Sequence, residues 1–356
     1  MLRAFSRSVA LRTRAWPHAA CAHRRGASGE ARAPSPPADT HAGSPPPHLP
    51  PAADAMLRGV GQVLFCNSAA TGGGLLFALS LADPLLALYA SMGTAVAHAV
   101  SAGARLDSSA RADGLASYNG CLVGCAFSVF LPMAGVGPMG VPLATAVGAA
   151  ASPFVAAVLG PSMGRVPQWT LAFNAVALCA LLHARPLVGA TAPAPATAWE
   201  LASAPLRGVS QIFVADSATC GAAVLAVVAA TYSPACAGAL LVGSATGSAV
   251  GALVGADSAE IAHGLWGFNP ALTSLAVAVF FTPTRQSAAL AVGGAAATAV
   301  AFGAAKAVCG SFAAPALTVP FCAVATMCYL LAGRMPGLAL AAAPHSPERN
   351  RADADR

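Results

Sequence analysis

Between about residues 59 and 333 the chain consists of apolar stretches that are interrupted only by glycine, proline and isolated charged residues. Four stretches approach the roughly 20 residues that a helix needs to cross the hydrocarbon core of a bilayer. They are 85–100, 137–159, 236–255 and 287–305. Shorter apolar segments lie between them. The pattern therefore predicts an all-α polytopic membrane protein.

Three pairs of segments match one another in the same order and at nearly the same spacing. LRGVGQVLF (57–65) matches LRGVSQIFV (206–214), GLASYNGCLVG (114–124) matches GLWGFNPALTS (264–274), and WTLAFN (169–174) matches LTVPFC (317–322). The first pair places Gln62 and Gln211 149 residues apart, and the second places Asn119 and Asn269 150 apart. This regularity indicates a tandem duplication of one unit.

Each unit contains apolar segments that are broken by polar residues, glycine or proline at matching places. Such paired interruptions point to a solute site near the middle of the membrane. We count about five crossings per unit, and an odd number would place the two copies in inverted orientation. The predicted parts are a disordered N-terminal extension (1–55), a first transmembrane repeat (56–190), a linker (191–204), a second repeat (205–334) and a polar C-terminal tail (335–356).

Composition supports the membrane assignment, because 56% of the residues are hydrophobic and only 9% are charged. Soluble domains carry roughly a quarter charged residues. The net charge of +6 comes largely from seven arginines within residues 1–38, which contain one acidic residue, Glu30. This segment suits an organellar transit peptide or a cytosolic tail that follows the positive-inside rule. We expect a multi-pass protein of the plasma membrane, with an organellar membrane as the alternative.

The candidate residues suit the passage of a solute across the membrane rather than catalysis. The sequence offers no nucleophile–base pair, no metal-ligand cluster and no phosphate-binding loop, so we predict no enzyme, no cofactor and no metal site. The arginines of the N-terminus lie in a segment without a fold signal, which argues against nucleic-acid binding. An ion-coupled transporter needs an acidic or histidine side chain inside the bundle. Asp216 is the one candidate near a glutamine segment.

The segments LRGVGQVLF, YNGCLVG, GLWGFNPAL and LTVPF, in this order and spacing, resemble the urea transporter family from about Leu57 to Leu331. The resemblance implies a homotrimer in membrane lipid, in which every protomer has its own pore. It also implies two inverted five-helix repeats, each with a tilted half-membrane pore helix. The implied activity is facilitative, channel-like transport of urea through a narrow, slot-shaped filter.

The resemblance also implies which residues form the solute pathway. Glutamines supply polar groups, aromatic and aliphatic side chains form the slot walls, and a threonine pair lies at the centre. These residues are Gln62, Val63, Phe65, Tyr118, Leu122, Thr170, Gln211, Ile212, Val214, Phe268, Leu272 and Thr318. Asn119 and Asn269 are expected to support the broken helices by satisfying free backbone groups.

Urea explains why these residue types are needed. It is flat and neutral, and removing its water without replacement partners costs several kcal/mol. Aromatic rings offer rigid, flat walls, while glutamine oxygens and backbone carbonyls freed at helix breaks accept hydrogen bonds from its N–H groups. The alternatives are a channel for other small neutral solutes (amides, water or ammonia) and a proton-coupled urea transporter.

Overall fold

The structure of the protein is a computed structural model that describes residues 49–184 and 196–355. Within these residues it contains fifteen α-helices and one short 3-10 helix, and one isolated antiparallel bridge joins Phe281 to Leu340. The helices are α1 (Pro51–Gln62), α2 (Ala69–Ala82), α3 (Pro84–Gly103), α4 (Ser108–Ala112), α5 (Tyr118–Met133), α6 (Gly140–Met163), α7 (Leu171–Ala184), α8 (Ala198–Ser210), η1 (Gln211–Phe213), α9 (Ala218–Thr231), α10 (Pro234–Leu253), α11 (Ser258–Ala262), α12 (Phe268–Phe280), α13 (Arg285–Gly310), α14 (Val319–Leu330) and α15 (Pro347–Ala354).

Four helices are long and apolar enough to cross a membrane, namely α3, α6, α10 and α13. α3 and α13 contain the predicted stretches 85–100 and 287–305, and α6 and α10 cover all but two or three residues of 137–159 and 236–255, so the four predicted spans are confirmed. The segments Ala198–Phe213 and Ala218–Thr231 form a fifth candidate span that is bent by 76° at its break. The other apolar helices of the described residues have 10–17 residues. The count of about five crossings per unit therefore remains a prediction.

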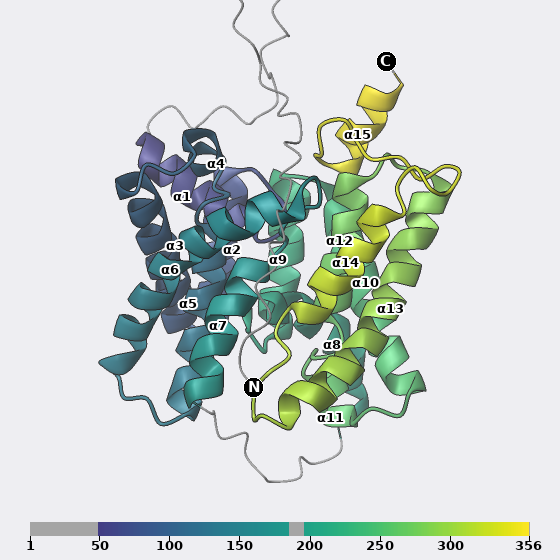
Figure 1. The fold of residues 1–356 in the computed structure, drawn as a ribbon. Helices are drawn as coiled ribbons and strands as arrows, with labels where there is room; N and C mark the ends of the chain where they lie inside the picture. The colour runs from purple at the N-terminus through teal and green to yellow at the C-terminus, as the bar shows by residue number, and fades with distance from the viewer. Residues whose placement is uncertain (1–48, 185–195, 356) are drawn as a thin grey trace, which may run out of the picture. The chain divides into compact units, whose positions relative to one another are not determined.

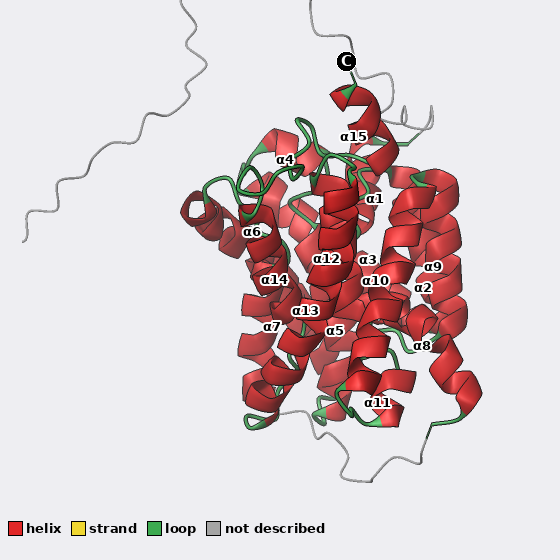
Figure 2. Cartoon of the chain, turned by 90° about the vertical axis from the view of Figure 1, so that its right-hand side faces the viewer, coloured by secondary structure: helices red, strands yellow, loops and turns green. Residues whose placement is uncertain are grey.

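Helices of the first half recur in the second half with closely similar lengths. α2 and α9 have 14 residues each, α3 and α10 have 20 each, and α4 and α11 have five each. The matching helices lie at opposite ends of the bundle, because α1 and α4 are at one end while α8 and α11 are at the other (Figures 1 and 2).

Matched polar residues begin the matched helices. The hydroxyls of Ser68 and Ser217 accept hydrogen bonds from backbone N–H groups three residues ahead, at the start of α2 and α9. The carboxylate of Asp83 accepts from the amide of Leu85 at the start of α3, and the hydroxyl of Ser233 accepts from that of Cys236 at the start of α10; proline occupies the first helical position of both. Such caps satisfy N–H groups that have no partner in the helix, and proline loses nothing at that position. The local sequence therefore fixes these helix starts.

Two glycines let α1 and α8 approach the helices that follow them. A Cβ atom at Gly72 would lie 1.8 Å from the carbonyl oxygen of Leu57, and one at Gly221 would lie 1.9 Å from that of Leu206. A side chain therefore cannot be accommodated at either position without moving the helices apart. The same close contact in both halves explains the glycine in each copy.

Two predicted boundaries differ from the structure. α1 begins at Pro51, inside the predicted extension 1–55, because proline suits the first helical turn. α8 begins at Ala198, inside the predicted linker 191–204, where Thr197 and Glu200 form a reciprocal capping box. The remainder of the extension (1–48) and the linker residues 191–195 lie outside the described residues.

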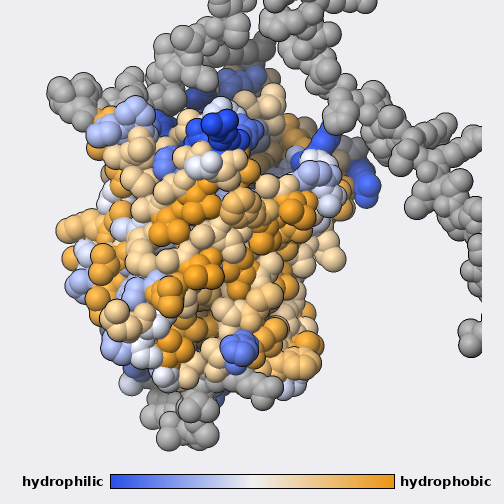
Figure 3. Space-filling view, turned by 60° about the vertical axis from the view of Figure 1, so that its left-hand side comes forward, coloured by the Kyte–Doolittle hydropathy of each residue, from blue (hydrophilic) through white to orange (hydrophobic). Residues whose placement is uncertain are grey.

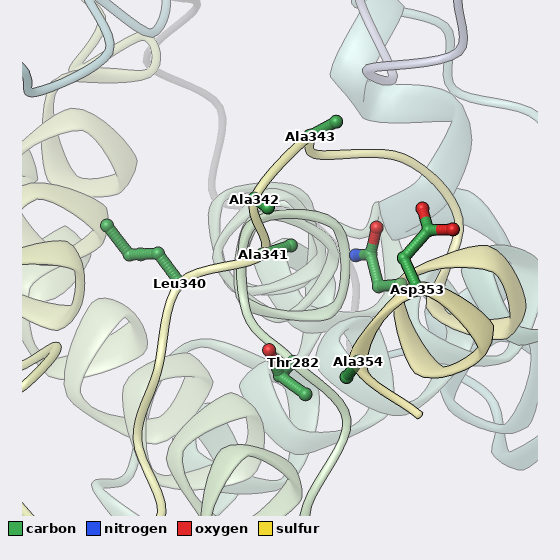
Figure 4. A pocket seen from close by; sticks show the side chains of 8 residues that line it. Thr282, Leu340, Ala341, Ala342, Ala343, Asp353 and Ala354 are labelled. Atoms are coloured by element: carbon green, nitrogen blue, oxygen red, sulfur yellow. The ribbon is translucent and has the colours of Figure 1, made fainter. Parts of the chain in front are cut away.

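The predicted polar C-terminal tail is folded against the bundle. We call residues 335–355 the C-terminal strap. The amide of Ala341 donates to Phe280 O at 3.0 Å, and the buried Asn350 donates through Nδ2 to Val279 O at 2.7 Å. A cavity of about 200 Å³ lies beside this junction, lined by Thr282 and by residues of the strap, some of them on α15 (Figure 4). The sequence did not reveal these tertiary contacts, because residues 344–355 of the strap are polar and have no apolar period.

A carboxylate of the strap also caps a membrane helix. The hydroxyl of Ser233 and the amide of Ala235 donate to Glu348 at 2.8 and 3.1 Å, at the start of α10. Nearby, His345 stacks on Tyr232 with ring centroids 5.0 Å apart. Burial opposes ionisation of Glu348, but hydrogen bonds to its carboxylate from its own backbone amide, Ser233, Ala235 and Ser346 together outweigh burial and lower its pKa.

We expect acid to release the strap. Because folding lowers the pKa of Glu348, its carboxylate stabilises the docked strap above the ordinary carboxyl pKa of 4.5. This contribution is lost as the pH falls through the lowered pKa. Hydrogen exchange of the α15 amides, corrected for intrinsic rates, should accelerate between about pH 6 and about pH 3. A Glu348→Gln variant should lack this acceleration, and an equal response in both proteins would contradict the assignment.

Candidate functional site

Two threonines from the two halves meet in the buried centre of the bundle. Thr170 and Thr318 stand immediately before α7 and α14, and their hydroxyl oxygens are 2.7 Å apart. The backbone N–H and the hydroxyl of Thr318 both donate to Asn174 Oδ1 at 3.1 Å. Cys322 Sγ lies 3.3 Å from Thr170 Oγ1. The structure thus brings together the predicted threonine pair, and it adds Asn174 and Cys322, which occupy the matched last positions of WTLAFN and LTVPFC.

The two predicted support asparagines hydrogen-bond to the starts of the helices that follow these threonines. Asn119 Oδ1 accepts from the amide of Phe173 at 3.1 Å, at the start of α7. Asn269 Oδ1 accepts from the amide of Phe321 at 3.1 Å, and its Nδ2 donates to Leu317 O at 3.0 Å. Free N–H groups at a buried helix start need such partners. Each asparagine therefore joins the start of its own helix to the start of another.

The two glutamines make equivalent hydrogen bonds at opposite ends of the bundle. Gln62 Nε2 donates to Asp113 O at 2.8 Å, and Gln211 Nε2 donates to His263 O at 2.9 Å. A carbonyl oxygen can only accept, so each bond orients the amide with its nitrogen toward the backbone. The side-chain oxygen Oε1 of each glutamine is therefore turned away from that carbonyl.

Around the predicted pathway the backbone adopts the left-handed conformation, which residues other than glycine rarely take. Phe65 and Val214 have φ angles of 56° and 61°, and Trp169 and Leu317 have φ angles of 49° and 47°. Phe65 and Val214 are the last residues of the two glutamine segments, and Trp169 and Leu317 directly precede the threonines. Left-handed non-glycine residues are costly and persist where the surroundings hold them, which is frequent at functional sites.

Charged networks stand beside the glutamines, and their composition differs between the halves. In the first half, Arg58 NH1 donates to Asn67 Oδ1 at 3.1 Å, and Asn67 Nδ2 donates to Asp113 Oδ1 at 3.1 Å. In the second half, Asp216 contacts Arg207 NH1 at 2.5 Å and His263 Nδ1 at 2.6 Å. The second network fixes Asp216 between two basic side chains.

The apolar residues that the sequence assigns to the slot walls belong to one hydrophobic cluster that spans both halves. Val63, Leu122, Ile212 and Leu272 are buried in it, each at most 2% exposed. The partly buried members of this predicted set are Phe65, Tyr118, Val214 and Phe268. The structure therefore brings these side chains together, while their contact with a solute remains a prediction.

An aromatic cluster surrounds Phe65 and was not predicted from the sequence. The ring of Phe65 packs edge-on against Trp169 and Phe280, with centroids 6.0 and 5.6 Å away. Trp169 also contacts Phe321 and Tyr329 at 5.6 and 6.2 Å. The signal in the sequence was the position of Trp169 beside Thr170 in WTLAFN. The other three rings come from α12 and α14, far away along the chain, and had no such signal.

The outer surface of the bundle suits a lipid environment. Large apolar side chains of α3 and α6 are exposed, including Leu85, Leu88, Leu143, Val147 and Val158. One face of the molecule is covered largely by apolar side chains, and strongly hydrophilic ones gather mainly at one end (Figure 3). Exposed apolar helices around a buried, hydrogen-bonded centre define a multi-pass integral membrane protein.

Comparison with known sequences gives the family. The chain matches the family described as "Urea transporter" over residues 53–333, and it belongs to that family. It is 29% identical over 301 residues to "Urea transporter 1" of Ovis aries, covering 78% of this chain and 76% of the relative. The corresponding Rattus norvegicus protein is 31% identical over 304 residues, with the same coverage. Since the family consists of transporters, the prediction that the chain is not an enzyme is confirmed.

Proposed function

We propose that the protein carries urea across a membrane by facilitative, channel-like passage through a narrow, slot-shaped filter. The observation that carries this proposal is the matched pair of glutamine amides. Each donates its nitrogen to a backbone carbonyl, Gln62 to Asp113 O and Gln211 to His263 O, and so keeps an oxygen available as an acceptor. A neutral solute with several N–H donors needs such acceptors when it leaves water.

The remaining parts of the proposed pathway follow from the same requirement. The hydroxyls of Thr170 and Thr318 would supply polar partners at a buried position where the two halves meet. The rings of Phe65, Tyr118 and Phe268 would form flat walls against the two faces of the solute. No charged side chain is needed for an uncharged solute, and the carboxylate of Asp216, five residues after Gln211 in the sequence, is paired with Arg207 and His263.

The proposed architecture is a pair of inverted repeats, with α1 and α8 as the tilted half-membrane pore helices. The positions of α1 and α8 at opposite ends of the bundle support this arrangement (Figure 1). The 76° bend between the segment that contains α8 and the segment that forms α9 supports a helix that enters and turns back. Matching breaks of this kind are typical of transporters whose solute site lies at the repeat interface. We also propose that the protein forms a homotrimer and resides in the plasma membrane, with an organellar membrane as the alternative.

The test is urea efflux from proteoliposomes that contain the purified protein, followed by stopped-flow light scattering. Fast urea flux that is the same with and without a proton gradient would support a channel. Flux that requires the gradient would support the proton-coupled alternative instead. Protein-free liposomes give the background, and folded protein without urea flux would refute the proposal. Efflux of formamide, ammonia and water from the same vesicles separates a urea channel from a general channel for small neutral solutes.

Replacing Asp216 with asparagine distinguishes the two mechanisms at the level of one side chain. Asparagine keeps the shape and still accepts from Arg207, and the first half uses Asn67 at the matched position. We therefore expect urea flux through Asp216→Asn to stay within about twofold of the wild type, since an exposed ion pair contributes little. Gradient-dependent flux that disappears in this variant would show instead that Asp216 carries a proton.

A further inference from the structure

Trp169 occupies the middle of the aromatic cluster at the predicted pathway. Its ring contacts Phe65, Phe280 and Phe321, with centroids 6.0, 5.2 and 5.6 Å away, in edge-on arrangements. The residue is 3% exposed. Edge-on aromatic pairs have preferred geometries and resist displacement. The position of the Phe65 ring therefore depends on the indole that packs against it.

Trp169 is held by hydrogen bonds at both its side chain and its backbone. Indole Nε1 donates to the Thr326 hydroxyl on α14 at 2.9 Å. The Tyr118 hydroxyl donates to the backbone carbonyl of Trp169. The left-handed backbone at Trp169, with φ of 49°, then leads directly into Thr170. One residue therefore contacts two predicted slot walls and precedes the central threonine.

The second half lacks this arrangement. Leu317 occupies the position that matches Trp169, and Val214 occupies the one that matches Phe65. The backbone carbonyl of Leu317 accepts from Asn269 Nδ2 rather than from a tyrosine hydroxyl. Both large rings are therefore present in one half and absent from the other, although the left-handed backbone is the same in both.

We propose that Trp169 determines specificity by holding Phe65 and Tyr118 at the spacing that admits a flat, unsubstituted amide. The proposal rests on the proposed function. A rigid wall excludes a methyl group on the solute nitrogen because neighbouring rings fill the space into which the wall would move. Trp169 acts through the two wall residues and is a positioning residue. A leucine at this position loses both the ring contacts and the bond to Thr326, so the Phe65 ring gains freedom to turn.

The test compares two solutes in the same proteoliposomes. In Trp169→Leu, the permeability of N,N′-dimethylurea relative to urea is expected to rise about tenfold, within the range over which a small apolar group is discriminated. The ratio of the two protein-mediated permeabilities does not depend on how much active protein the vesicles contain. A variant that only lost folded protein would therefore leave this ratio unchanged. Trp169→Phe, which keeps a ring, should restore much of the selectivity. Trp199→Leu is the matched control, because Trp199 is 78% exposed at the start of α8.

A second variant keeps the test decisive if Trp169→Leu does not fold. Thr326→Val removes the acceptor of the indole N–H and retains a branched side chain, so the ratio should rise roughly threefold through a freer indole. The inference would be overturned if Thr326→Val and every folded Trp169 variant carried urea and had the wild-type permeability ratio of N,N′-dimethylurea to urea. Absence of urea flux from the wild type would refute the proposed function itself, and the two failures are thereby distinguished.

Discussion

Urea flux is expected to fall by about one to two orders of magnitude when either Gln62 or Gln211 is replaced by alanine. Each substitution removes an acceptor at one end of the proposed pathway and leaves a backbone carbonyl, Asp113 O or His263 O, without its hydrogen bond. A solute that has shed its water then lacks a partner, which costs about 1–3 kcal/mol for each group left unsatisfied. Stopped-flow efflux from proteoliposomes measures the loss directly.

Two further variants test whether the position and the amide of the glutamine matter. Gln286→Ala removes an exposed glutamine at the start of α13 and should leave flux unchanged. Gln62→Glu keeps acceptor oxygens but has no N–H group for Asp113 O, so the side chain loses its orientation and flux should also fall. Wild-type flux in both alanine variants would remove the glutamines from the pathway.

The second large effect concerns stability, at Asn269. Replacement by leucine leaves the amide of Phe321 and the carbonyl of Leu317 without their partners in a fully buried region. We expect a loss of about 2–6 kcal/mol, since each orphaned buried group costs about 1–3 kcal/mol. Thermal unfolding in detergent, followed by size-exclusion chromatography, gives the comparison with the wild type.

The matched residue supplies the reference for that experiment. Asn119 makes one hydrogen bond of this kind, from the amide of Phe173, while the carbonyl matched to Leu317 O is bound by Tyr118. Asn119→Leu should therefore destabilise less than Asn269→Leu. Equal losses of stability would mean that the change in packing volume, rather than the lost hydrogen bonds to backbone groups at the helix breaks, determines the destabilisation at both positions.

The long spans could be predicted because their length and apolar composition are local properties. The stretch 85–100 needed only to be counted, and α3 contains it. The meeting of Thr170 and Thr318 could be expected because the repeat and the family resemblance make them equivalent. The contacts of Trp169 with Phe280 and Tyr329 could not, because nothing local tells which distant rings pack together.

The C-terminal strap illustrates the same limit. Residues 344–355 of the strap are polar, with no apolar period to suggest a packed helix, yet Asn350 is buried against Val279 O and Glu348 caps α10. Both anchors satisfy backbone groups at the ends of membrane helices, and these groups become available only once the bundle has formed. The hydrogen bonds that hold the strap are therefore a property of the assembled fold.

In the proposed passive pathway, the unequal halves, in which Val214 and Leu317 match Phe65 and Trp169, have a kinetic consequence. A passive pathway obeys detailed balance, so equal urea on both sides gives no net flow whatever the shape of the two ends. At low concentration the permeability must also be the same in both directions. The asymmetry emerges only when the pathway is crowded with solute, as different half-saturation concentrations for influx and efflux, with maximal rates that differ by the same factor.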